Sequence, residues 1–241
     1  MGNVARTVFL FDVDNTLLDN DAVQDDLSAH LEREVGLVSR VRYWEIFEQL
    51  RAELGYADYL GALQRYRLEH QDDPQVLRVC FFLLDYPFAD RLYRGALAAL
   101  ARCRALGPTV ILSDGDVVFQ PRKIERSGLW EAVDGQVLIY IHKEEELADV
   151  ERRYPAAHYV LVDDKLRILA AIKRTWGPKV TTVFPRQGHY AHDPAAAATY
   201  PPADIAIERI GDLVAYDLPA LLAAAAGGPA GQSAVRGGGG R

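Results

Sequence analysis

Two aspartates one residue apart follow a short apolar run near the start of the chain. Val8–Phe11 is continuously apolar and rich in β-formers, which predicts a buried parallel strand that ends at Asp12. Asp12 and Asp14 lie close enough to raise each other's pKa values, so the pair is costly unless a cation or a reaction uses it. Ligands of open α/β sheets collect at the carboxyl ends of strands. The pair is therefore the first candidate for a catalytic or metal-binding site.

Polar residues also follow three later apolar runs that predict strands. Ser113 and Asp114 follow Thr109–Leu112, Lys143 follows Val137–Ile141, and Asp163 and Asp164 follow Tyr159–Val162. A hydroxyl and backbone N–H groups at the start of a helix suit an anion. If the strands are parallel, all of these residues meet at one edge of the sheet.

These motifs resemble those of the haloacid dehalogenase superfamily of phosphohydrolases. Phe11–Leu17 matches its DxDxT motif in full, Ile111–Ser113 matches the second motif, Lys143 the lysine of the third and Val162–Asp164 the acidic fourth. The order of the four motifs is that of the family. Two details depart from it, because no proline follows Lys143 and Ile168 stands where a further acid is common.

The resemblance implies nucleophilic catalysis on a phosphoryl group. Asp12 would attack phosphorus to form an aspartyl-phosphate, and Asp14 would protonate the leaving oxygen and then deprotonate a water. Mg²⁺ would lie between Asp12, the backbone carbonyl of Asp14 and Asp164. We assign Asp164 as the direct ligand because it takes the place of the aspartate in the more common Gly-Asp form; Asp163 would support it.

The remaining roles concern the phosphate group. Ser113, Asp114 and Lys143 would bind the phosphoryl oxygens, and Lys143 would also offset the charge of Asp12. Thr16 is expected to brace the loop after the first strand. Lys123 is the alternative to Lys143, but it falls inside an expected helix, so its replacement should resemble an ordinary surface change.

The fold class predicted is α/β, a doubly wound parallel sheet with an all-helical cap inserted after the first strand. Between about 20 and 89, apolar residues recur at helical spacing in four segments and no strand signal occurs. From Tyr93 onward, expected helices and strands alternate. We expect a core at 1–18 and 90–226, a cap at 19–89 and a disordered tail at 227–241.

Three local expectations complete this outline. Val76–Leu84 is apolar almost all round and is expected to be buried between layers. Phe184–Asp204, between the last two strands, is expected to be a loop, in which His189 and His192 are exposed and form no second metal site. A final helix is expected at Leu213–Ala224.

The composition limits the kinds of partner that the protein is expected to bind. The 241 residues carry a net charge of −7, which argues against a nucleic-acid binder. Two cysteines make no disulfide framework, and no apolar run reaches the length of a signal peptide core or a membrane span. We therefore expect a cytoplasmic protein without a membrane or nucleic-acid partner.

The leading functional prediction is a Mg²⁺-dependent hydrolase of a small phosphate ester, with the cap selecting the substrate. A phosphomutase or a haloacid dehalogenase of the same superfamily and a catalytically silent Mg²⁺-binding module are the alternatives. Dehalogenation needs no proton for its leaving group, and members that catalyse it lack the second aspartate, so Asp14 argues against it. Intact Asp12 and Asp14 argue against the silent module.

Overall fold

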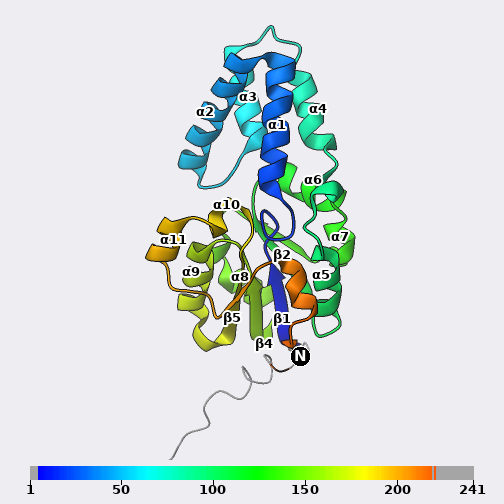
Figure 1. Ribbon diagram of the computed structural model, residues 1–241, viewed down its shortest axis with the longest axis vertical. Helices are drawn as coiled ribbons and strands as arrows, with labels where there is room; N and C mark the ends of the chain where they lie inside the picture. Colours follow the sequence, from blue (N-terminus) through cyan, green and yellow to red (C-terminus); the bar gives the residue numbers. More distant parts are fainter. Residues whose placement is uncertain (1–4, 219, 221–241) are drawn as a thin grey trace, which may run out of the picture.

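Six parallel strands form the sheet at the centre of the fold (Figure 1). The computed structural model describes residues 5–218 and 220. The strand order is β3-β2-β1-β4-β5-β6, and every neighbouring pair is parallel. This confirms the predicted doubly wound α/β core. The strands span Ala5–Phe11 (β1), Thr109–Asp114 (β2), Val137–Tyr140 (β3), Ala156–Val162 (β4), Val180–Pro185 (β5) and Ile205–Ile207 (β6).

Alternating side chains of β1 pack on opposite faces of the sheet. Phe9 and Phe11 belong to one apolar cluster, whereas Val8 and Leu10 belong to another, as the period of two along a strand requires. Helices cover both faces, so β1 is buried on each side. These helices are α5 (Ala96–Arg104), α6 (Phe119–Arg126), α7 (Leu129–Ala132), α8 (Leu147–Arg153) and α9 (Leu166–Trp176), with short 3₁₀ turns η1 (Phe88–Arg91), η2 (Lys143–Glu145), η3 (Gly177–Lys179) and η4 (Ile210–Val214).

The segment after β1 is a bundle of four helices that lies beyond the carboxyl edge of the sheet (Figure 1). It consists of α1 (Asn20–Val35), α2 (Leu37–Leu54), α3 (Tyr59–Glu69) and α4 (Val76–Asp85), and we call it the helical insertion. The Asp19 and Asp58 carboxylates accept hydrogen bonds from Ala22 N–H and Gly61 N–H and so cap α1 and α3. The four expected helices are confirmed in this part of the chain.

The fourth helix differs from the expectation. Val79 and Leu83 are buried, but Leu77 and Phe81 on the other side of α4 are exposed. The helix therefore packs with one face only, a difference that its nearly uniform apolar sequence does not reveal.

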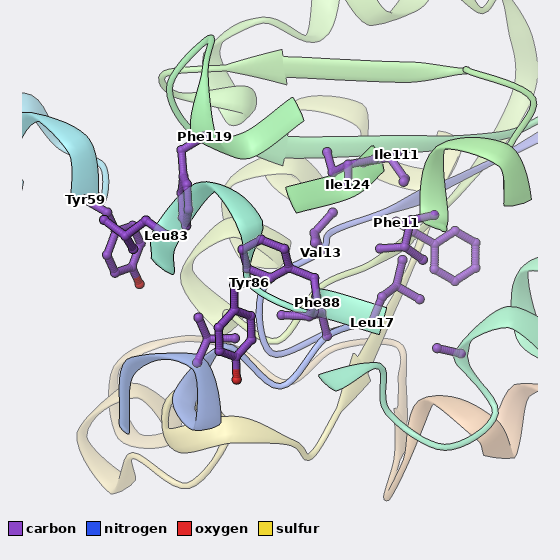
Figure 2. Packing of buried hydrophobic residues seen from close by; sticks show 14 of the residues in the cluster. Phe11, Val13, Leu17, Tyr59, Leu83, Tyr86, Phe88, Ile111, Phe119 and Ile124 are labelled. Carbon is purple, nitrogen blue, oxygen red and sulfur yellow. The ribbon is translucent and has the colours of Figure 1, made fainter. Parts of the chain in front are cut away.

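The start and the end of the helical insertion lie next to each other. Asp19 N–H donates to Arg91 O over 2.8 Å, and Tyr93 N–H donates to Leu17 O over 2.9 Å. Phe119 on α6 packs against Tyr59 of α3, with ring centroids 5.1 Å apart (Figure 2). Backbone pairing and aromatic packing thus join the insertion to the sheet.

The segment between β5 and β6 is not the loop that the sequence predicted. It contains two short helices, α10 (Gly188–Ala191) and α11 (Pro194–Thr199), and Asp193 caps the second by accepting from Ala195 N–H. The expected last helix is also misplaced at its start, because Leu213 belongs to η4 and residues 215–217 are not helical. The remainder of that helix and the expected tail lie outside the described residues.

Two further observations concern the expected partners and the cysteines. Within the described ranges, no helix is long and apolar enough to cross a membrane. Cys80 and Cys103 are free thiols, and Cys103 is buried.

Phe119→Ala tests the aromatic contact between α6 and the helical insertion. The side chain is 1% exposed, so its removal should lower the free energy of unfolding by about 3–5 kcal/mol. Urea unfolding measures the change. Phe81→Ala on the exposed side of α4 is the control and should cost less than about 1 kcal/mol. Equal losses in the two variants would contradict the proposed importance of this contact.

Candidate active site

Asp12 follows β1 and lies against a buried lysine. Its N–H donates to Val162 O, so the residue continues the ladder between β1 and β4 at the carboxyl edge. Lys143 Nζ contacts Asp12 Oδ1 at 2.6 Å and Asp163 Oδ2 at 2.7 Å. Both Lys143 and Asp163 are almost fully buried. The three residues come from the ends of β1, β3 and β4, as the topology predicts for parallel strands.

Asp164 is held in place by its backbone but not by its carboxylate. Its N–H donates to Thr16 Oγ1 over 3.0 Å, which gives Thr16 a bracing contact. Both Asp164 oxygens are buried, and neither has a hydrogen-bond partner among the described residues. One oxygen each from Asp12, Asp163 and Asp164 lies within 4.8 Å of the others. Buried carboxylate oxygens without donors fit a hard divalent cation.

Burial controls the protonation of this cluster. It raises the pKa of Asp164 well above its usual value, against the opposing effect of Lys165. Burial also raises the pKa of Asp163 to about 6, while Lys143 pulls in the opposite direction. For Lys143 itself, burial disfavours the ammonium, but Asp12 and Asp163 outweigh it and raise the pKa. Among the groups that titrate here, Asp164 therefore has most to gain from a bound cation.

Asp14 pairs with Lys123, which lies inside a helix as expected but is not at the surface. Lys123 Nζ lies 2.7 Å from Asp14 Oδ1, and the lysine side chain is fully buried. The expectation that Lys123 is an ordinary surface residue was therefore wrong. The cause is its place on α6, where it shares the buried face with Phe119 and Ile124. One face of α6 thus carries both core side chains and a charged side chain.

Ser113 and Asp114 close β2 beside these residues. Ser113 Oγ accepts a hydrogen bond from Gln120 Nε2 over 2.9 Å. Asp114 Oδ1 accepts from Lys143 N–H over 2.8 Å, so this carboxylate fixes the turn that delivers Lys143. Burial raises the pKa of Asp114. One oxygen of the Asp114 side chain is thus engaged in holding this turn.

A cavity of about 590 Å³ opens beside Asp14 and is lined by the sheet edge, the helical insertion and the α10–α11 segment. Tyr56 and Tyr59 come from the insertion, and Tyr190 comes from α10. Arg51 on α2 donates a hydrogen bond to the Tyr190 hydroxyl. His189 is exposed, as expected, and contacts Asp21 through Nδ1 at 2.6 Å. Core and insertion thus both shape the cavity.

The comparison with known families agrees with this geometry. The sequence model of the haloacid dehalogenase-like hydrolases matches residues 7–192, which contain all four motifs. This chain belongs to that family. It is therefore a haloacid dehalogenase-like hydrolase.

Solved structures of this hydrolase type resemble the chain to different degrees. A haloacid dehalogenase-like hydrolase from Burkholderia xenovorans LB400 is 67% identical, with a TM-score of 0.85 over 88% of this chain and 99% of the other. The L-2-haloacid dehalogenase from Xanthobacter autotrophicus is 17% identical, with a TM-score of 0.57 over 92% and 99% of the two chains. At that identity the second likeness shows the fold alone. No curated protein sequence matches the chain.

Three side chains near the candidate active site were missed or misjudged from sequence. Gln120 and Lys123 lie three residues apart on α6 and both contact Asp14. Lys165 lines the cavity, with Nζ 5.0 Å from the centroid of the Tyr190 ring. For the two lysines the signal was their scarcity, because the chain has five lysines and these two lie here together with Lys143.

Asp164→Asn tests whether Asp164 binds a cation. At about 100 times its Kd, Mg²⁺ should stabilise the wild type by about 2.7 kcal/mol, or a Tm increase of about 5–10 °C. The increase should nearly vanish in the variant, because the unpartnered carboxylate is gone. It should also shrink in the wild type as the pH falls, because protons compete for a carboxylate whose pKa is raised.

Differential scanning calorimetry with and without Mg²⁺ measures these shifts. Asp25→Asn, an exposed change on α1, is the matched control and should keep the full increase. An undiminished Mg²⁺ effect in Asp164→Asn would mean that the cation binds elsewhere.

Proposed function

We propose that this hydrolase cleaves small phosphate monoesters through an aspartyl-phosphate on Asp12, with Mg²⁺ as its cofactor. The observation that carries the proposal is that both Asp164 oxygens, beside Asp12, are buried and have no hydrogen-bond partner in the part of the chain that the structure describes. A carboxylate that attacks a phosphate dianion needs positive charge to offset the repulsion. Displacement of a halide by a carboxylate has no such need, so a cation site beside the nucleophile favours phosphoryl transfer.

The residues that would hold Mg²⁺ are Asp12, Asp164 and the backbone carbonyl of Asp14. Bound there, the ion would neutralise charge on Asp12 and on the phosphoryl oxygens. Asp163 would support the site through its contact with Lys143. Thr16 would fix the position of Asp164 by accepting its N–H.

In the first step, an Asp12 oxygen forms a bond to phosphorus while the bond from phosphorus to the ester oxygen breaks. Asp14 donates a proton to the departing alkoxide. Lys143 stabilises the charge that develops on the phosphoryl oxygens, and Ser113 hydrogen-bonds to one of them. In the second step, Asp14 takes a proton from water, which attacks phosphorus and releases inorganic phosphate and the Asp12 carboxylate.

The cavity favours a small leaving group that both parts of the chain enclose. Tyr56 and Tyr59 of the helical insertion face the same space as Tyr190 of the core. The insertion would therefore act as the cap that selects the substrate and excludes water during phosphoryl transfer. Its place over the carboxyl edge of the sheet supports this role (Figure 1).

Asp12→Asn should abolish phosphate release, because the amide is a poor nucleophile. We expect a loss of more than about 10³-fold with p-nitrophenyl phosphate and Mg²⁺. Phosphate release from a panel of small phosphomonoesters, measured with Mg²⁺ and with EDTA, provides the test. The fold is checked by far-UV circular dichroism, and Asp25→Asn is the matched control.

Three results would contradict the proposal. Activity that persists in EDTA would exclude the cation. Halide release from 2-chloropropionate without phosphate release would indicate a dehalogenase. Transfer of the phosphoryl group from the protein to a second hydroxyl, instead of water, would indicate a mutase.

Asp14→Asn should slow phosphoryl transfer most for substrates with poor leaving groups. An alkoxide needs a proton as it leaves, whereas p-nitrophenolate does not. In single-turnover experiments, the rate should therefore fall by about 10²-fold or more for an alkyl phosphate and much less for p-nitrophenyl phosphate. Equal losses for the two substrates in this step would argue against Asp14 as the acid.

A further inference from the structure

Lys123 lies deep in the structure and has few partners. Its side chain is 0% exposed, and Nζ contacts Asp14 Oδ1 at 2.7 Å and Asn20 Oδ1 at 3.1 Å. The rings of Phe119 and Tyr59 lie 5.1 Å and 5.7 Å from Nζ. An ammonium removed from water is costly unless oxygens and ring faces replace its hydration. Here oxygens of Asp14 and Asn20 and the two aromatic rings take the place of that hydration.

Helix α6 approaches both oxygens of Asp14. Lys123 binds Oδ1, while Gln120 Nε2 lies 3.4 Å from Oδ2 and 2.9 Å from Ser113 Oγ. Gln120 and Lys123 are one helical turn apart, so one rigid element sets the orientation of this carboxylate. Asp14 is only partly buried and faces the cavity. Without these contacts, its side chain would be free to rotate toward solvent.

The same lysine is connected to the helical insertion. Asn20, the first residue of α1, accepts from Lys123 and donates through Nδ2 to the Tyr59 hydroxyl over 3.1 Å. Gln24 Nε2 also donates to that hydroxyl, over 2.9 Å. Figure 2 shows Tyr59 beside Phe119, the residue that packs against Lys123 from its own helix. The position of α3 therefore bears directly on the surroundings of the lysine.

We propose that Lys123 is a positioning residue that fixes the Asp14 carboxylate toward the bound ester and, through Asn20 and Tyr59, links it to the seated helical insertion. This inference rests on the proposed phosphatase function. Its consequence is that the leaving group meets an oriented Asp14 only when Tyr59 is in place. A substrate that keeps the insertion from packing over the site reacts without an oriented Asp14 as proton donor and without enclosure by the insertion.

A double-mutant cycle tests the proposal. Lys123→Met, Asp14→Asn and the double variant are compared with an alkyl phosphate and with p-nitrophenyl phosphate, and kcat and KM are measured separately. Lys123→Met should lower kcat for the alkyl phosphate by about 10-fold or more, with KM within about threefold. Like Asp14→Asn, it should reduce hydrolysis of the alkyl phosphate more than hydrolysis of p-nitrophenyl phosphate. The double variant should match Asp14→Asn alone.

Matched variants separate positioning from a structural role. Methionine fills the apolar space, and Asp14 can hydrate from the cavity, so we expect Lys123→Met to fold. If it does not, Lys123→Arg keeps the charge and should retain more alkyl phosphate activity than Asp14→Asn. Tyr59→Phe keeps the ring but removes the acceptor for Asn20, and should show a weaker loss of the same pattern. Lys179→Met, at the opposite edge of the sheet, should match the wild type.

Each outcome has a distinct meaning. If the losses from Lys123→Met and Asp14→Asn multiply in the double variant, Lys123 acts independently of Asp14 and this inference is overturned. The inference is also overturned if Lys123→Met lowers kcat equally for the two substrates. A wild type that releases no phosphate from any ester overturns the proposed function, and this inference with it.

Discussion

A lysine ammonium shared by two buried carboxylates is the interaction on which the candidate active site depends. Asp12, Asp163 and Asp164 lie close together at the ends of β1 and β4, where their mutual repulsion opposes folding. Lys143 lies against the first two at less than 3 Å. Loss of one partner from such a buried pair typically costs about 3–5 kcal/mol. The Asp114 carboxylate, which holds the Lys143 backbone, is therefore part of the same arrangement.

The site contains two ion pairs of different character. Lys143 and Asp12 form an almost completely buried pair, whereas Lys123 is buried but Asp14 faces the cavity. Gln120 contacts both Asp14 and Ser113 and so connects α6 with the end of β2. This division fits the proposed reaction, in which Asp12 attacks and Asp14 transfers protons.

The sheet and the strand-end residues could be predicted because a buried parallel strand has a simple sequence signature. Val8–Phe11 is apolar without interruption, so the polar residues after it had to lie at the sheet edge. Lys143 was predicted on the same basis. Lys123 was not, because helical periodicity shows a shared face with Phe119 and Ile124 but not what lies opposite it.

The other errors have similar causes. Leu77 and Phe81 are apolar but exposed, and sequence alone does not show which side of α4 has a neighbour. The α10–α11 segment was expected to be a loop because its helices are only 4 and 6 residues long, too short for a periodic pattern. Its contacts with Asp21 and Arg51 join residues more than 130 positions apart in the sequence. No local pattern predicts such contacts.

The pairing of Asp19 with Arg91 and of Leu17 with Tyr93 has a consequence for how this architecture can vary. The two chain segments that enter and leave the helical insertion lie side by side. The intervening residues, about 70, therefore connect to the sheet as a hairpin turn would, at a small loop-closure cost. Asp12, Lys143, Asp163 and Asp164 all lie outside that segment. The sheet can therefore carry insertions of different length and shape without rebuilding its charged centre.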